Sequence, residues 1–516
     1  MLFNSYGFLF LYLPLVLTGF FVVARKGRLY AAAWLAAASL FFYGWWNPVF
    51  VWLLLASILF NYAVGTVLAK SDAIKRRWLL VAAIGANLSL LAYFKYANFF
   101  LDAASQLMGW NLPLSDVLLP LGISFFTFTQ IAFLVDVHRG LAREFNLVHY
   151  VLFVTYFPHL IAGPVLHHKQ MMPQFRREET YQFSGNGAVW GLAIFTLGLA
   201  KKVLLADSLA EFADPVFESA GRGQAPMLVS AWTGALAYTL QLYFDFSGYS
   251  DMAIGLSLMF GVRLPVNFNS PYKALNIIEF WRRWHMTLSQ FLRDYLYITL
   301  GGNRRGPVWR HVNLMVTMVL GGLWHGASWT FVAWGALHGL FLVINHAWIT
   351  CKGRLRWLNV FPLGLRQLSA VGLTFVCVVM AWVLFRAERF DVAQTMFAGM
   401  LTLNGVSLPQ SMELASLRDL GWTFSGLFAD NEKLQALGAG ACLQVMLVGL
   451  FIVWVCPNTQ QLLGYQADWS PAAGADRSDR PRIWTPKLGS AVCLALLFGV
   501  SLISFSKASP FLYFQF

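Results

Sequence analysis

The chain has 516 residues, of which 58% are hydrophobic and 12% are charged, and its mean hydropathy is +0.58. Soluble domains carry roughly 25% charged residues, so the composition excludes an ordinary soluble enzyme and indicates an integral membrane protein. The formal net charge of +13 does not indicate a nucleic-acid partner, because Lys and Arg occur in short clusters between apolar segments, where the positive-inside rule expects them. We expect residues 1–516 to form a single integral-membrane domain.

The N-terminal part of the chain predicts five membrane spans. Its apolar runs approach the roughly 20 residues that a spanning helix needs, and they lie near 6–24, 29–46, 49–69, 78–94 and 117–137. Basic clusters follow the first run, at 25–28, and the third run, at 70–77. The positive-inside rule therefore predicts that both loops are cytoplasmic and that the N-terminus is outside.

The middle of the chain is less regular. The segment from Phe157 to Pro164 is short and interrupted by Pro and Gly, which favours a re-entrant or interfacial segment. Residues 276–300 mix basic and aromatic side chains, which predicts an amphipathic helix at the cytoplasmic interface. The stretch 301–306 is then expected to form a flexible basic loop, and it lacks the spacing of a P-loop.

Two acidic residues of the middle region, Asp245 and Asp251, lie beside apolar runs. They belong either to a buried hydrogen-bond network or helix cap, or to the polar lining of a cavity. The sequence leaves both interpretations open.

The C-terminal part predicts further spans near 331–350, 367–385, 440–456 and 489–505. The segment 388–438 between two of them carries six acidic and three basic residues, which favours an external loop. The last span would leave residues 506–516 on the outer side. We expect roughly 10–12 spanning helices in an all-α fold, and no internal repeat indicates an inverted-repeat transporter.

His325 lies in the glycine-rich stretch Gly321–Trp329, within an apolar segment that begins near His311. An ionisable residue inside a membrane is a functional-site hypothesis by default, and imidazole can accept a proton from a hydroxyl near neutral pH. The alternative is a histidine that forms a hydrogen bond between helices. A second histidine, His285, follows the aromatic and basic run that starts at Phe280. The five cysteines show no metal-binding spacing, so no metal site is predicted.

The chain resembles the membrane-bound O-acyltransferase (MBOAT) family, and most closely its bacterial branch of alginate and peptidoglycan O-acetylating proteins. Similarity is greatest from about 117 to 340. The blocks that carry the resemblance are Leu119–Phe125, Phe157–Pro164, Tyr243–Asp251, Phe280–His285 and Gly322–Gly326.

The resemblance implies a ring of helices around a central funnel, with additional re-entrant or interfacial helices. It makes His325 the essential histidine and His285 its companion. It also implies that an acyl group, expected to be acetyl, passes from a cytoplasmic thioester such as acetyl-coenzyme A to an envelope or secreted polysaccharide. The expected donor-binding residues are Arg282, Arg283, Arg304, Arg305, Trp324 and Asp245; for the arginines, anchoring on the cytoplasmic side is the alternative.

The mechanism expected from this resemblance uses His325 as general base on an attacking hydroxyl, while His285 orients the thioester or stabilises the oxyanion. Two alternatives from other classes are a polytopic transporter and a non-catalytic scaffold of a polysaccharide-export complex. A transporter would show paired broken helices in two halves, and a scaffold has no need of two tryptophan–histidine motifs.

The C-terminal segment 506–516 is rich in aromatic residues. It is either an interfacial aromatic belt or, by resemblance to related acylation systems, a tail whose Tyr513 hydroxyl carries the acyl group. The implied acceptor is an extracytoplasmic serine-hydrolase-like protein of the SGNH/GDSL type. The implied location is the bacterial cytoplasmic (inner) membrane, with membrane lipid around the chain and both termini outside. The sequence names neither the polysaccharide nor the carrier of the thioester.

Overall fold

A computed structural model describes residues 1–109, 117–142, 145–161, 163–351, 362–412, 417, 422–465, 485, 487–507 and 511–512. Across these residues the regular structure is helical, and the only pairing of extended backbone is an isolated bridge between Ser407 and Thr423. The prediction of an all-α protein is therefore confirmed. The chain divides into two compact units, which are described separately.

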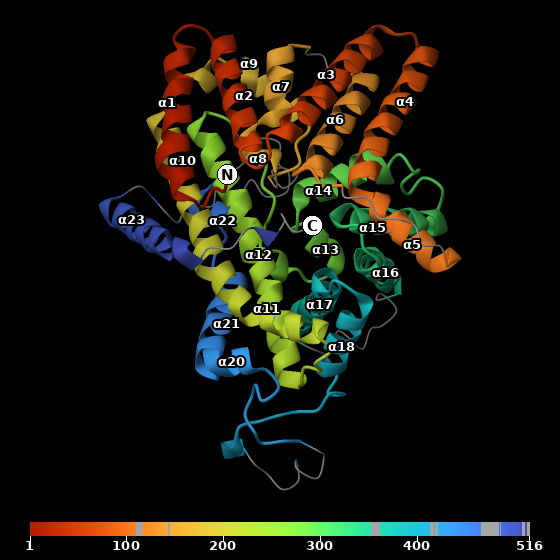
Figure 1. Cartoon of the computed structure of the whole chain (residues 1–516), viewed down its shortest axis with the longest axis vertical. Coiled ribbons are helices and arrows are strands. Elements are labelled where there is room, and N and C mark those ends of the chain that lie inside the picture. The colour runs from red at the N-terminus through yellow and green to blue at the C-terminus, as the bar shows by residue number, and fades with distance from the viewer. Residues whose placement is uncertain are drawn as a thin grey trace. The chain divides into compact units, whose positions relative to one another are not determined.

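Unit 1 comprises residues 1–200, 248–267 and 459–515. Its long helices α1, α2, α3, α4 and α6 run side by side as a bundle (Figure 1). Its elements are η1 (Phe8–Tyr12), α1 (Leu13–Ala24), α2 (Arg28–Gly44), α3 (Val49–Lys70), α4 (Ala73–Leu91), η2 (Ala92–Tyr96), α5 (Ala97–Met108), α6 (Ile123–His138), α7 (Leu147–Thr155), α8 (Phe157–Leu160), α9 (His168–Arg176), η3 (Glu179–Tyr181), α10 (Gly185–Ala200), α22 (Thr459–Leu463), α23 (Leu488–Ile503) and η11 (Ser504–Lys507).

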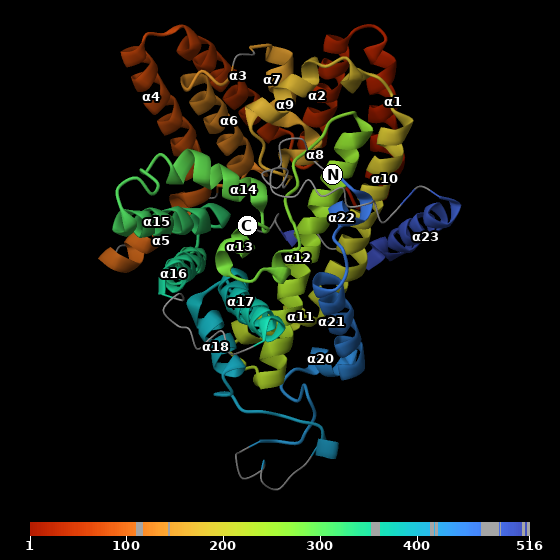
Figure 2. The ribbon, with the colours of Figure 1, turned by 180° about the vertical axis from the view of Figure 1, so that it is seen from behind.

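Unit 2 comprises residues 201–247 and 268–458, with residue 516. Its helices α15 and α16 pack along each other, as Figure 2 shows. Its elements are η4 (Lys201–Ala206), α11 (Asp207–Gly221), η5 (Pro271–Lys273), α13 (Ile277–Trp281), α14 (Met286–Phe291), η6 (Leu292–Tyr297), α15 (Pro307–His325), α16 (Trp329–Cys351), α17 (Leu363–Arg386), α18 (Phe390–Met400), η9 (Gln410–Met412), α20 (Glu432–Leu437) and α21 (Ala439–Trp454). Helix α12 (Leu228–Met259) contributes its first part to unit 2 and its last part to unit 1.

Five described helical stretches are long and apolar enough to cross a membrane: Val49–Lys70, Ala73–Met108, Gly185–Gly221, Trp329–Cys351 and Leu363–Arg386. Shorter apolar helices cover Phe8–Ala24, Ile123–His138, Ala439–Trp454 and Leu488–Ile503. The apolar runs predicted from the sequence coincide with these helices to within a few residues at most ends. Apolar runs of this length form helices because a bilayer leaves no other way to satisfy the backbone hydrogen bonds of one segment.

Two long helices were not predicted. The stretch Gly185–Gly221 is one continuous helix, in which the π-helical η4 links α10 to α11. Helix α12 has a weak hydropathy signal because polar residues interrupt it, yet every residue from Ala237 to Ser257 is buried. Protein rather than lipid surrounds this part of α12, and some of its polar side chains have partners inside the fold, as Asp245 does in Lys202.

Other segments differ in detail from the prediction. The single amphipathic helix expected at 276–300 is divided into α13, α14 and η6. The short segment from Phe157 forms the four-residue helix α8, which is fully buried, while Ala162 lies outside the described residues. The predicted loop 388–438 contains α18 and α20; its external location stays a prediction.

Glycines set the distance between α15 and α16. A Cβ atom on Gly322 would collide with the carbonyl oxygen of Phe331, and one on Gly335 would collide with that of Met318. Membrane helices use small residues in this way to bring two backbones into contact. The neighbour that Gly322 approaches is thus the backbone of α16.

We predict that Gly335→Ala destabilises unit 2, because overpacking a close interface costs roughly 1–3 kcal/mol. The midpoint of thermal unfolding in detergent should fall. Gly372→Ala on α17 is the matched control, since a Cβ there meets nothing within 4 Å. Equal unfolding midpoints for the two variants would contradict this account of the interface.

Candidate active site

His325 is the last residue of α15 and is buried, with 7% of its surface exposed. The carboxyl end of a helix carries partial negative charge, which stabilises a protonated imidazole. Three aromatic rings surround the imidazole edge-on, with centroids 4.9 Å away for Trp324, 5.1 Å for Trp334 and 5.2 Å for Phe385. These rings shield the imidazole from bulk water.

His285 lies in the turn between α13 and α14, and 1% of its surface is exposed. Its backbone has φ 41° and ψ 53°, the left-handed region that costs a residue with a side chain roughly 1–2 kcal/mol. Strain of this kind gathers at functional sites. Burial lowers the pKa of His285 to about 3, so the neutral ring can donate one hydrogen bond and accept another.

Trp324 connects the two histidines within unit 2. Its ring centroid lies 6.3 Å from that of His285 and 4.9 Å from that of His325. His285 also contacts Phe246 of α12, whose ring centroid is 4.8 Å away and whose plane is nearly perpendicular. The structure therefore brings together His285, His325 and Trp324, three of the residues predicted from the sequence.

Asp245 forms part of a buried charge cluster. Lys202 Nζ lies 2.7 Å from an Asp245 carboxylate oxygen and 2.8 Å from one of Asp207, and all three side chains are at most 5% exposed. In unit 1, Asp251 accepts a hydrogen bond of 2.6 Å from the Thr459 hydroxyl. Both contacts favour the hydrogen-bond-network interpretation of these acids. A role for Asp245 in donor binding stays a prediction.

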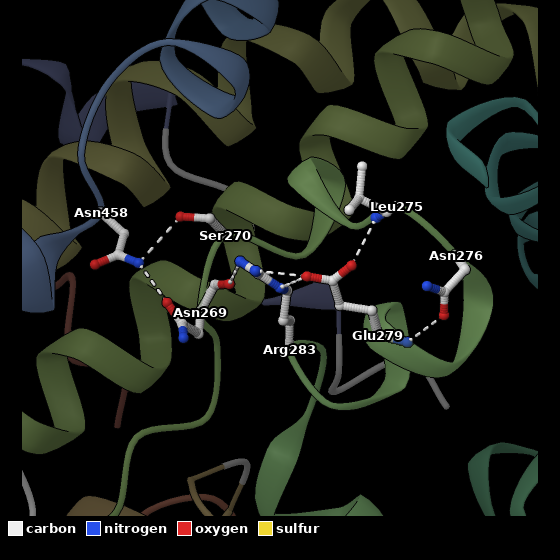
Figure 3. Close-up of polar contacts among 7 residues, drawn as sticks. All are labelled: Asn269, Ser270, Leu275, Asn276, Glu279, Arg283 and Asn458. Atoms are coloured by element: carbon white, nitrogen blue, oxygen red, sulfur yellow. Dashed lines mark hydrogen bonds and ion pairs between the residues drawn. The ribbon is translucent and has the colours of Figure 1, made fainter. Parts of the chain in front are cut away.

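Arg283 is held by contacts within unit 2, as Figure 3 shows. Its guanidinium donates to Glu279 at 2.7 and 3.1 Å and to the backbone carbonyl of Asn269 at 3.3 Å. The Asn269 amide donates in return to the Arg283 carbonyl, and Asn458 donates to the side chains of Asn269 and Ser270. This network braces the backbone just before His285, so it supplies Arg283 with a structural role.

The remaining predicted arginines are placed differently. Arg282, Arg304 and Arg305 are exposed and have no ion pair within the described part of the chain. The loop that carries the last two is a defined turn, because Asn313 donates to the Gly302 carbonyl and three of its glycines adopt positive φ. The loop predicted to be flexible is thus anchored, and it presents two adjacent cations to the solvent side.

Tyr513 lies outside the described residues. The two described residues before it, Phe511 and Leu512, are buried, and the Phe511 ring packs edge-on against Tyr249 of unit 1 at 4.8 Å. Tyr249 in turn stacks on Phe3. The burial of Phe511 and Leu512 argues against an exposed aromatic belt at these two residues.

Two residues near His325 were not singled out from the sequence. Trp334 and His338 lie on successive turns of α16, are at most 1% exposed, and have ring centroids 4.9 Å apart. Neither nitrogen of His338 has a hydrogen-bond partner among the described residues. His338 could have been identified by the same signal as His325, because it too is a lone histidine in an apolar run.

A cavity of about 820 Å³ lies in unit 1 along α1 and α2. Its lining is almost entirely apolar and includes Trp34, Trp45 and Trp46, but none of the predicted site residues. No group of three or more His, Cys, Asp or Glu side chains suited to a metal ion occurs among the residues described.

Residues 24–359 match the family model of the membrane-bound O-acyltransferases, a range that includes both histidines. The chain belongs to the membrane-bound O-acyltransferase family. Over its whole length it is 40% identical to a peptidoglycan O-acetyltransferase of Helicobacter pylori, covering 98% of that protein. It is also 40% identical to a protein of Azotobacter vinelandii named "probable alginate O-acetylase AlgI", over the full length of both chains.

More distant similarity connects the chain to a teichoic acid D-alanyltransferase of Streptococcus thermophilus, at 30% identity over 45% of this chain and 58% of that protein. MBOAT membership makes the chain a multi-pass membrane acyltransferase. The transporter and scaffold alternatives do not fit this result.

Proposed function

We propose that this MBOAT protein transfers an acetyl group from a cytoplasmic thioester across the membrane, for O-acetylation of an envelope or secreted polysaccharide. The observation that carries the proposal is full-length similarity to proteins named for O-acetylation of peptidoglycan and of alginate. An alginate-like exopolysaccharide and peptidoglycan are accordingly the two candidate polymers. Purified protein with radiolabelled acetyl-coenzyme A, followed by analysis of polymer esters, tests the proposal directly.

In the proposed reaction His325 is the general base. It accepts the proton of the attacking hydroxyl, whose oxygen then bonds to the thioester carbonyl carbon. The buried aromatic surroundings of His325 and its place at the end of α15 support this role. His285, neutral and held through Trp324, orients the thioester beside it.

For the donor we propose contacts from Arg282, Arg304 and Arg305. Their guanidinium groups are exposed and have no acidic partner among the described side chains, so they are available to the phosphates of coenzyme A or of a carrier's phosphopantetheine. The contacts of Arg283 with Glu279 make that residue a support for the site instead.

On the acceptor side we propose that Tyr513 receives the acetyl group and passes it to a serine-hydrolase-like protein of the SGNH/GDSL type. A phenol, with a pKa of about 10, is more acidic than an alkyl alcohol, and its ester remains activated for a second transfer. The burial of Phe511 and Leu512 supports a tail that enters the protein. We place the protein in the bacterial cytoplasmic membrane, with residues 388–438 and both termini outside.

His325→Ala should abolish acetyl transfer, because a positioned general base contributes roughly 10²–10⁴-fold to the rate. His325→Gln keeps most of the side-chain volume without a base and should be equally inactive. Acetylation of the polymer is measured in cells, and folding is checked by gel filtration of the purified variants. Normal polymer acetylation in either variant would refute the assignment of the base.

The double variant Arg304→Gln/Arg305→Gln should raise the KM for acetyl-coenzyme A while leaving kcat nearly unchanged, since it removes binding common to ground and transition states. Lys75→Gln/Arg77→Gln, which removes two exposed cations from another predicted cytoplasmic loop, is the control. Should kcat fall while KM stays constant, the two arginines serve only as topological anchors.

Tyr513→Phe removes one oxygen and keeps the aromatic ring. We expect loss of acetylated polymer together with retained donor binding, because the relay would lack its nucleophile. Mass spectrometry of the C-terminal peptide should show acetyl-tyrosine in the wild-type protein when the acceptor protein is withheld. Full polymer acetylation by Tyr513→Phe would show that the acyl group leaves by another route.

A further inference from the structure

Beside His325, the indole N–H of Trp334 is a buried hydrogen-bond donor with no partner among the described residues. Trp334 is 1% exposed and sits on α16, between Thr330 and His338 on the buried side of that helix. Buried donors are paired in the great majority of cases, and each exception calls for an explanation. Ring packing alone does not supply one, because phenylalanine would fill an aromatic site without a donor to desolvate.

The rings around Trp334 connect it directly to the proposed base. Its centroid is 5.1 Å from that of His325, and the two planes are nearly perpendicular at 87°. Phe385 completes the contact, at 5.2 Å from both rings. The His285 ring contacts Trp324, and Trp324 in turn contacts His325. Trp334 is thus in direct contact with the imidazole that would activate the hydroxyl.

An unpaired donor in a buried site is suited to a charge that exists only during the reaction. Donors fixed in advance, in surroundings without water, stabilise a developing oxyanion more strongly than the ground-state carbonyl. The backbone next to Trp334 is closely packed, because a Cβ on Gly335 would collide with the backbone of α15. The donor therefore needs little rearrangement when the charge appears.

We propose that Trp334 is the oxyanion donor of this enzyme, an inference that rests on the acetyl transfer proposed above. The hydroxyl oxygen bonds to the thioester carbonyl carbon while His325 takes the hydroxyl proton. The carbonyl oxygen becomes an oxyanion and accepts a hydrogen bond from Trp334 Nε1. The carbonyl then re-forms, the carbon–sulfur bond breaks, and His325 returns the proton to the departing thiolate, which leaves as a thiol.

The test compares Trp334→Phe with Trp382→Phe by steady-state kinetics of acetyl transfer from acetyl-coenzyme A. Both variants shorten a tryptophan with 1% exposure in the same aromatic cluster, and the two indoles stack at 5.8 Å. Trp334→Phe should lower kcat by about 10²–10³-fold, the loss found when one oxyanion donor is removed, with KM within about threefold of wild type. Trp382→Phe should keep kcat within about threefold.

Benzothienylalanine placed at position 334 separates the donor from the packing, because it keeps the shape of tryptophan and replaces the N–H with sulfur. It should reproduce the loss of kcat at an unchanged midpoint of thermal unfolding. Wild-type kcat with this residue, or equal losses in Trp334→Phe and Trp382→Phe, would overturn the proposal. Wild-type protein without acetyl transfer would instead refute the proposed function.

Discussion

The close packing of α15 on α16 is the constraint on which the candidate site depends. Gly322 and Gly335 allow the two backbones to meet, and no larger residue fits at either position without displacing its neighbour. That contact places Trp334 of one helix against His325 at the end of the other. Since van der Waals packing replaces the hydrophobic effect between helices in a membrane, the precision of this site comes from backbone proximity.

Burial of polar groups is the second constraint, and unit 2 meets it in several ways. Lys202 is surrounded by two carboxylates, so its charge is compensated where water is excluded. Arg283 is satisfied by Glu279 and by the carbonyl of Asn269, which stabilises the turn that carries His285. These groups are paired in the resting protein. Trp334 and His338, by contrast, have nitrogens without partners among the described residues, and Trp334 lies against the proposed base.

Paired polar groups also support the strained backbone of His285. A left-handed conformation at a residue with a side chain persists only when its surroundings impose it, and the network of Arg283, Glu279, Asn269 and Asn458 supplies that support. Asn458 follows α21, far along the chain from His285. The position of one histidine is therefore determined by segments that are distant in sequence.

The sequence by itself determined the class of the protein and most of its apolar helices, and it led to the hypothesis that His325 and His285 form the site. These follow from local properties, namely the length of apolar runs, the placement of basic clusters and a resemblance carried by short motifs. Helix α12 was not predicted, because burial by other protein segments permits polar residues that weaken its hydropathy signal. The helix Gly185–Gly221 was not predicted either, although its most apolar window has a mean hydropathy of 1.7. Only the tertiary structure decided which charges are engaged and which are available. Whether Arg283 binds a donor or Glu279, and whether Asp245 lines a cavity or pairs with Lys202, depends on neighbours that the fold brings from other parts of the chain.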